Sequence, residues 1–233
     1  MIGIKTIASS SKGNCYYVTD GSSPLLLEVG IRYSDIRKAL NFNTRDIQGC
    51  LVTHEHGDHS KGINDFLKSG INVYMSQGTK ESLEIEHHRI KTVKAKQQFQ
   101  LGTWTILPFE VEHDVLEPLG FLLQNKAGEK LLFATDTYYI RYKFKGLTHL
   151  LIECNYSLDI LNQNIVEGRV HKGMKKRLLR SHFSLENVKE FLKANDLSNV
   201  QEIHLLHLSD SNSSEELFKR EIQELTGKLV YIA

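Results

Sequence analysis

The chain lacks any long hydrophobic run, and it has few cysteines. No apolar stretch approaches the roughly 20 residues that a membrane-spanning helix needs, and the opening residues lack the layout of a signal peptide. Cys15, Cys50 and Cys154 have neither zinc-ligand nor paired spacing, which favours buried thiols in a reducing compartment. These absences predict a cytoplasmic protein without a membrane partner.

The chain also has little net charge. Its formal charge is +1, so the field of the whole molecule does not indicate a nucleic-acid binder. One local exception is a basic cluster from Lys172 to Arg180, in a segment that looks irregular near His171. This cluster is either a solvated surface or a contact for substrate phosphates. With 40% hydrophobic and 24% charged residues, residues 1–233 are expected to form a single globular domain.

The most informative segment is a loop that is crowded with potential metal ligands. A short apolar run, residues 49–53, reads as a buried strand, and it leads into the sequence Thr-His-Glu-His-Gly-Asp-His-Ser at 53–60. Imidazole and carboxylate groups together suit zinc, manganese or iron. Three histidines are more than one proton transfer needs, so the loop indicates a metal site rather than a solvated polar loop.

The spacing within this loop predicts two pairs of ligands. In an extended chain, residues two apart face the same side, so His54 and His56 can bind one ion together. Gly57 allows a sharp turn. Asp58 and His59 are then expected to point away from the first pair, towards a second ion.

This segment resembles the signature of the metallo-β-lactamase fold superfamily. His113, Asp136 and His207 each follow a later apolar run and match the superfamily's remaining ligand motifs. The resemblance implies two divalent ions, zinc or manganese, with Asp136 between them. The implied ligands are His54, His56 and His113 for one ion, and Asp58, His59 and His207 for the other.

A narrower likeness is to the YycJ/WalJ branch, which is associated with 5′-to-3′ DNA exonuclease activity. It rests on the segments 9–18, 117–121, 153–155 and 206–212. Three positions depart from the pattern. Glu28 stands where the superfamily has an aspartate that orients a ligand histidine from behind, Tyr156 replaces a histidine, and only Ser-His-Phe-Ser around His182 remains of a longer motif.

The pattern of strands and helices predicts an α/β fold. The resemblance makes it a four-layer αββα sandwich of the metallo-β-lactamase type. Expected strands include residues 2–8, 15–19 and 24–29, and a helix is expected at 34–40. Ser184 is expected to cap one later helix, and Ser213 or Ser214 the last one, which stops at Gly227.

Two close cations would lower the pKa of a bridging water and so supply hydroxide near neutral pH for attack on a phosphodiester. Asp58 or Asp136 could orient that hydroxide. His182 is predicted to protonate the leaving oxygen or to hold a phosphate, the alternative being a surface histidine.

Other side chains are candidates for binding substrate. Ser10, Ser11 and Asn14 either bind a terminal phosphate or form a simple turn. Trp104 and the tyrosines Tyr138, Tyr139 and Tyr142 offer either base-stacking surfaces or ordinary packing.

The leading hypothesis is therefore a dinuclear phosphodiesterase, a DNA exonuclease. The alternative is a hydrolase of a small ester, lactone, thioester or cyclic phosphodiester, because one scaffold hosts many chemistries. A non-catalytic binding module is the third possibility. The sequence leaves the oligomeric state open.

Overall fold

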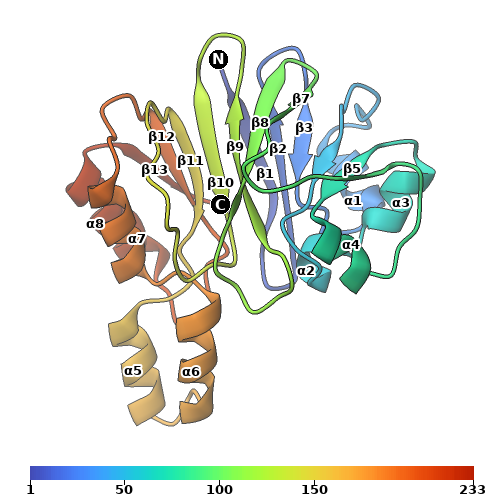
Figure 1. Ribbon diagram of the computed structural model, residues 1–233. Coiled ribbons are helices and arrows are strands. Elements are labelled where there is room, and N and C mark those ends of the chain that lie inside the picture. Colours follow the sequence, from blue (N-terminus) through green and yellow to red (C-terminus); the bar gives the residue numbers. More distant parts are fainter. The chain divides into compact units, whose positions relative to one another are not determined.

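The computed structural model describes all residues, Met1 to Ala233, and divides into two compact units. The first unit comprises residues 1–110 and 115–129, and the second comprises residues 111–114 and 130–233. Each unit combines β-strands with helices (Figure 1).

A six-stranded sheet forms most of the first unit. Its strand order is β1-β2-β3-β4-β5-β6, antiparallel from β1 to β3 and parallel from β3 to β6. Ile36, Ile63 and Phe66 pack the helices α1 and α3 against these strands. The elements are β1 (Gly3–Ser10), β2 (Gly13–Thr19), β3 (Leu25–Leu27), α1 (Tyr33–Ala39), β4 (Cys50–Leu51), α2 (Gly57–Ser60), α3 (Ile63–Lys68), β5 (Val73–Met75), α4 (Gln77–Ser82) and β6 (Ile90–Thr92).

Three antiparallel strands complete the first unit: β7 (Phe99–Leu101), β8 (Trp104–Glu110) and β9 (Leu119–Gln124). Trp104 has no exposed surface, and its indole Nε1 donates a hydrogen bond of 2.7 Å to the carbonyl of Ser23. Trp104 is therefore a packing residue and offers no surface for stacking.

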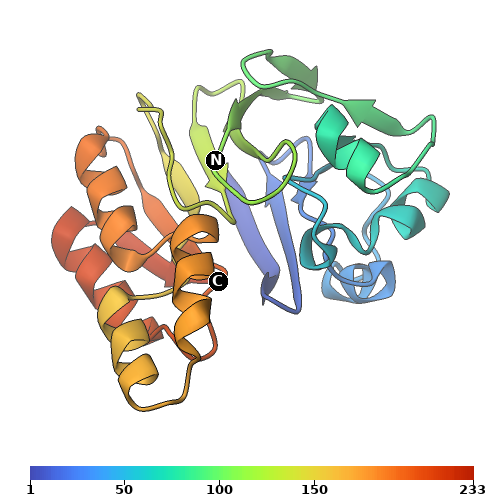
Figure 2. The same cartoon turned by 60° about the horizontal axis from the view of Figure 1, so that its bottom comes forward.

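The second unit is built on four parallel strands in the order β13-β12-β11-β10. The helices α7 and α8 lie side by side next to these strands (Figures 1 and 2). The central strand β11 is buried along its whole length, as a parallel strand covered on both faces requires. The elements are β10 (Lys130–Ala134), β11 (His149–Glu153), α5 (Leu158–Val166), α6 (Lys172–Ser181), α7 (Leu185–Ala194), β12 (Glu202–Leu206), α8 (Glu215–Thr226) and β13 (Leu229–Ile232).

The caps of the last two helices are confirmed. The side chain of Ser184 accepts a hydrogen bond at the start of α7, Ser214 does the same for α8, and Gly227 ends α8 with a φ of 65°. The segment after His171, predicted to be irregular, is instead the helix α6. The sequence did not reveal this helix because most of its residues are polar or basic, and its Leu178 packs in a small apolar cluster shared with α5.

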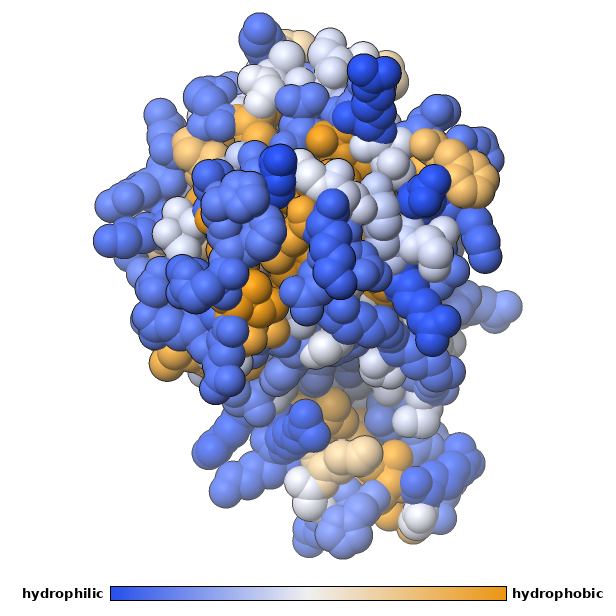
Figure 3. Space-filling model, turned by 90° about the vertical axis from the view of Figure 1, so that its right-hand side faces the viewer, coloured by the Kyte–Doolittle hydropathy of each residue, from blue (hydrophilic) through white to orange (hydrophobic).

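The surface in Figure 3 is mostly hydrophilic, and its hydrophobic residues are scattered rather than joined into one patch. None of the helices combines the length and the hydrophobicity that crossing a bilayer requires.

The three cysteines are free and have no exposed surface. Burial raises the pKa of each thiol, because the thiolate would lose its hydration. We therefore expect a thiol-specific disulfide reagent to modify no cysteine in the native protein and all three after denaturation, as measured by the absorbance of the released thiolate. Rapid modification of the native protein would contradict this burial.

Candidate metal centre

The loop after β4 carries the first group of polar side chains. β4 is fully buried, so the chain emerges from the core directly before His54. His54 is 1% exposed and His59 has no exposed surface. Residues Gly57–Ser60 form the helical turn α2 rather than extended chain. The rings of His54 and His59 lie 4.2 Å apart, so the two predicted pairs are close neighbours within the loop.

His54 and His56 face each other across a distance that one cation could bridge. His54 Nε2 lies 3.1 Å from His56 Nδ1. On the other side of its ring, His54 Nδ1 is 2.9 Å from the hydroxyl of Thr53. A hydrogen bond at one ring nitrogen fixes the orientation of the other, which is how proteins aim metal-binding histidines.

Asp58 and His59 form the second pair, and Asn14 of β2 contacts both of them. His59 Nε2 lies 3.2 Å from Asp58 Oδ2. The Asn14 amide nitrogen contacts both groups, at 3.2 Å from His59 Nε2 and 3.3 Å from Asp58 Oδ2. Asn14 has no exposed surface, whereas Ser11 is exposed at the neighbouring turn. The Asn14 side chain thus supports the loop from behind.

Glu28 lies beneath the same loop with no exposed surface. Its carboxylate accepts a hydrogen bond from the Thr53 backbone at 3.3 Å, and one oxygen is 3.6 Å from His59 Nδ1. Burial raises the pKa of Glu28, and the contacts with His59 and Thr53 offset this only in part. Glu28 therefore occupies the position from which it can orient His59, despite being one methylene longer than the expected aspartate.

A close backbone approach also fixes the loop. The Gly30 backbone donates to the Asn14 carbonyl at 2.9 Å. A Cβ atom on Gly30 would lie 1.5 Å from the backbone oxygen of Asp58. Only glycine fits at this position without moving the segment that carries Asp58 and His59.

The second unit places potential metal ligands at the carboxyl ends of its parallel strands. Asp136 follows β10, Glu153 ends β11 and His207 follows β12. Because parallel strands end at the same edge, these residues meet there, and His182 joins them from the end of α6. One ligand atom from each of these four residues lies within 4.8 Å of the others.

Glu153 is the centre of this group, and it was not predicted as a site residue. One carboxylate oxygen lies 2.7 Å from His182 Nδ1 and 3.0 Å from His207 Nδ1. The other oxygen accepts from the backbones of Thr137 and Phe183, each at 3.0 Å. The signals in the sequence were an acidic residue at the end of an apolar strand and its place in segment 153–155, one of the segments that resemble the YycJ/WalJ branch.

The charges of Glu153 and His182 stabilise each other. Burial disfavours ionised Glu153, but the charge of His182 and its hydrogen bond outweigh burial, so the pKa of Glu153 lies below its ordinary value. Burial likewise disfavours charged His182, whereas the charge and hydrogen bond of Glu153 raise its pKa above the usual value. His182 is therefore a mostly buried, charge-paired histidine and not a surface residue.

His113 belongs to the second unit and lies close to Asp136. Its Nδ1 is 3.0 Å from the backbone oxygen of Ser181, and its Nε2 is 3.9 Å from Asp136 Oδ2. Burial lowers the pKa of His113 despite the nearby carboxylates. A neutral imidazole is the form that binds metals.

Three residues of these groups have left-handed backbone conformations. The φ angles are 63° for Glu28, 47° for Asp136 and 53° for His207. Such angles are uncommon outside glycine and persist where the surroundings hold them, often at functional sites.

A family model described as the β-lactamase superfamily domain matches residues 34–204, most of the chain. The chain belongs to this superfamily. It is 29% identical to exodeoxyribonuclease YycJ of Bacillus anthracis over 94% of this chain and 87% of that protein. It is 28% identical to exodeoxyribonuclease WalJ of Streptococcus pneumoniae over 93% of this chain and 86% of that protein.

Solved structures show the same fold. The metallo-β-lactamase fold protein YhfI of Bacillus subtilis matches with a TM-score of 0.73 at 14% identity, over all of this chain and 97% of that one. A diphosphatase of the PhnP family matches with a TM-score of 0.68 at 14% identity, over all of this chain and 95% of that one. The predicted metallo-β-lactamase-type α/β fold is confirmed, and the protein is a metal-dependent hydrolase.

The contact at Gly30 can be tested by substitution. We expect Gly30→Ala to lower the free energy of unfolding by about 1–3 kcal/mol, the usual cost of overpacking, because the Asp58 backbone must move. Chemical denaturation measures this change. Gly3→Ala is the matched control, since its Cβ meets only ordinary contacts with Thr19. Equal stabilities of the two variants would show that the Asp58 segment adapts freely.

Proposed function

We propose that residues 1–233 act as one dinuclear-metal-dependent phosphodiesterase domain that degrades DNA from the 5′ end towards the 3′ end. The observation that carries this proposal is the set of oriented histidine and aspartate side chains in each unit, in a chain similar to two exodeoxyribonucleases.

The donor set fits two divalent cations, zinc or manganese, because it consists of imidazole nitrogens and carboxylate oxygens. We assign Asp136 to both ions. The other ligands are His54, His56 and His113 for one ion, and Asp58, His59 and His207 for the other. The hydrogen bond between Thr53 and His54 and the one that His113 donates to the Ser181 carbonyl support this assignment, because they fix the ring orientations.

When bound, such a pair of ions supplies a nucleophile at neutral pH and neutralises charge on the phosphate. The chain's own residues then position the reaction. Asp58 is partly exposed and is hydrogen-bonded to Asn14, so it can orient the attacking water. His182 is bonded to Glu153 through Nδ1, which leaves the proton on Nε2 for the departing oxygen. Ser10 and Ser11 remain candidates for contact with a terminal phosphate.

The surface of α6 supports a nucleic-acid substrate. Lys172, Lys176, Arg177 and Arg180 are exposed, and none of them forms an ion pair with an acidic side chain. Leu178 faces the cluster shared with α5, so most of these cations lie on the opposite side of the helix. Because α6 ends directly before His182, the cations can contact phosphates next to the site of cleavage.

The exonuclease activity can be tested with duplex DNA labelled at either the 5′ or the 3′ end, in the presence of manganese or zinc. We expect release of 5′ nucleotides by the wild type and at least about a hundredfold loss of rate in His56→Ala, because a ligand is removed. His88→Ala, an exposed histidine outside the ligand groups, is the control. If DNA stays intact while small esters are hydrolysed, the small-substrate alternative replaces this proposal.

The role of α6 predicts a change in salt dependence. We expect neutralisation of its four exposed cations to glutamine to lower the slope of log Kd against log salt for duplex DNA by about 3 to 4, since each phosphate contact contributes about 0.9. The slope is measured by fluorescence anisotropy. Neutralising Lys38, Lys68, Lys91 and Lys94, which are exposed in the first unit, removes the same charge and should leave the slope near that of the wild type. Equal slopes for both variants would show that the cations of α6 make no particular contact with the DNA phosphates.

A further inference from the structure

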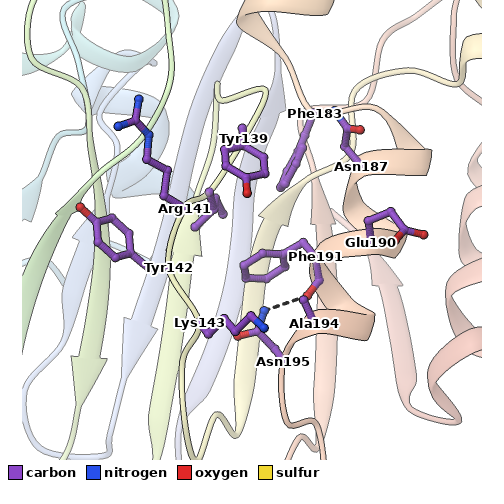
Figure 4. A pocket seen from close by; sticks show the side chains of 11 residues that line it. Tyr139, Arg141, Tyr142, Lys143, Phe183, Asn187, Glu190, Phe191, Ala194 and Asn195 are labelled. Carbon is purple, nitrogen blue, oxygen red and sulfur yellow. Dashed lines mark hydrogen bonds between the residues drawn. The ribbon is translucent and has the colours of Figure 1, made fainter.

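A pocket of about 280 Å³ lies in the second unit, between the segment 139–143 and the helix α7. Figure 4 shows Tyr139, Phe183 and Asn187 at one end of this pocket and Lys143 and Asn195 at the other. Its volume is near the lower limit of ligand pockets, so it suits a group of the size of a nucleobase rather than a larger ligand.

The pocket begins beside the second unit's ligand group. Phe183 follows His182, and its backbone donates to Glu153 at 3.0 Å. Tyr139 is only three residues after Asp136, which places it at most about 10 Å along the chain from that ligand. A nucleotide adjacent to the scissile phosphate could therefore reach the pocket.

Aromatic rings form much of the pocket wall. Phe183 and Phe191 are buried, with ring centroids 6.2 Å apart. Tyr139 is 54% exposed, and its ring stacks on no other ring of the protein. An exposed aromatic face of this kind is available to a flat ligand.

The charged side chains of the pocket differ in whether they already have an ion-pair partner within the protein. Arg141 is paired with Glu112, and Glu190 with Lys193. Lys143, by contrast, is exposed and has no acidic partner. The pocket thus has an uncompensated positive charge, which favours an anionic ligand.

The two asparagines of the pocket also differ in whether their amide groups are fully hydrogen-bonded within the protein. Both ends of the Asn195 amide are bonded within the protein, to Phe144 and to Phe191. The Asn187 amide donates to the Tyr138 carbonyl, while its oxygen accepts no hydrogen bond from the protein. Asn187 Oδ1 can therefore accept one from a ligand.

We propose that this pocket receives the base of one nucleotide of the substrate strand, with the base stacked on Tyr139 and hydrogen-bonded at its edge to Asn187, and with the phosphate of that nucleotide next to Lys143. The inference rests on the proposed function, since it requires a nucleic-acid substrate. The stacked base lies beside the phosphodiester that is cleaved, so the pocket helps to hold the strand in position for hydrolysis.

A cycle of paired changes in protein and DNA tests this inference. The metal-loaded enzyme is assayed on 5′-phosphorylated strands in which a single abasic residue occupies successive positions from the 5′ end. We expect one position at which the abasic residue raises KM about 5- to 100-fold, as loss of one stacked base predicts. Tyr139→Ala should raise KM similarly on the intact strand and show no further increase with the abasic residue at that position.

Two variants make the result specific. Tyr139→Phe keeps the ring and should retain a KM close to that of the wild type. Tyr231→Ala removes another exposed tyrosine of the second unit, 43% exposed and outside the pocket, and should keep the full effect of the abasic residue. Two results would overturn the nucleotide pocket alone. One is an unchanged KM in Tyr139→Ala; the other is that Tyr139→Ala and the abasic residue raise KM independently of each other at every position. Failure of the wild type to degrade any strand would overturn the proposed function and this inference together.

Discussion

The second unit depends on a carboxylate that has no contact with solvent. Glu153 would be costly to bury as an ion unless its oxygens were fully hydrogen-bonded. Two histidines and two backbone N–H groups meet this need. Because these partners come from the segments after β10, α6 and β12, the same bonds that compensate the charge also hold Asp136, His182 and His207 together. The hydrogen bonds that allow Glu153 to be buried as an ion are therefore the same bonds that set the positions of these side chains.

The first unit fixes its histidine-rich loop through both backbone and side-chain contacts. Gly30 touches the Asp58 backbone, Asn14 contacts Asp58 and His59, and Glu28 accepts from Thr53. Each contact joins the loop to a neighbouring strand or its end, so the β-sheet itself positions the side chains. The positive φ of Glu28 turns its carboxylate beneath the loop, at a position where most residues would be strained.

Local chemistry explains which features the sequence could predict. The apolar run before His54, the caps at Ser184 and Ser214 and the stop at Gly227 each depend on residues within one turn of the chain, and the structure confirms them. The helix α6 was missed because its stability comes from packing against α5. Glu153 was missed for a related reason, since its partners are distant in sequence and burial of a charge leaves no local pattern.

The contiguous segment 172–195 contains the basic helix α6, His182, to which we assign the role of proton donor in the proposed function, and one wall of the pocket. Its middle is fixed, because His182 and the Phe183 backbone are both bonded to Glu153. Its first part, α6, contacts α5 through only a few apolar side chains and presents its charges to solvent. Under the proposed function, changes on the exposed face of α6 therefore alter attraction for the strand without moving Asp136, His182 and His207, whereas changes at Glu153 disturb the whole segment. The proposed function thus allows affinity for the nucleic-acid backbone and the geometry of the chemical step to vary independently.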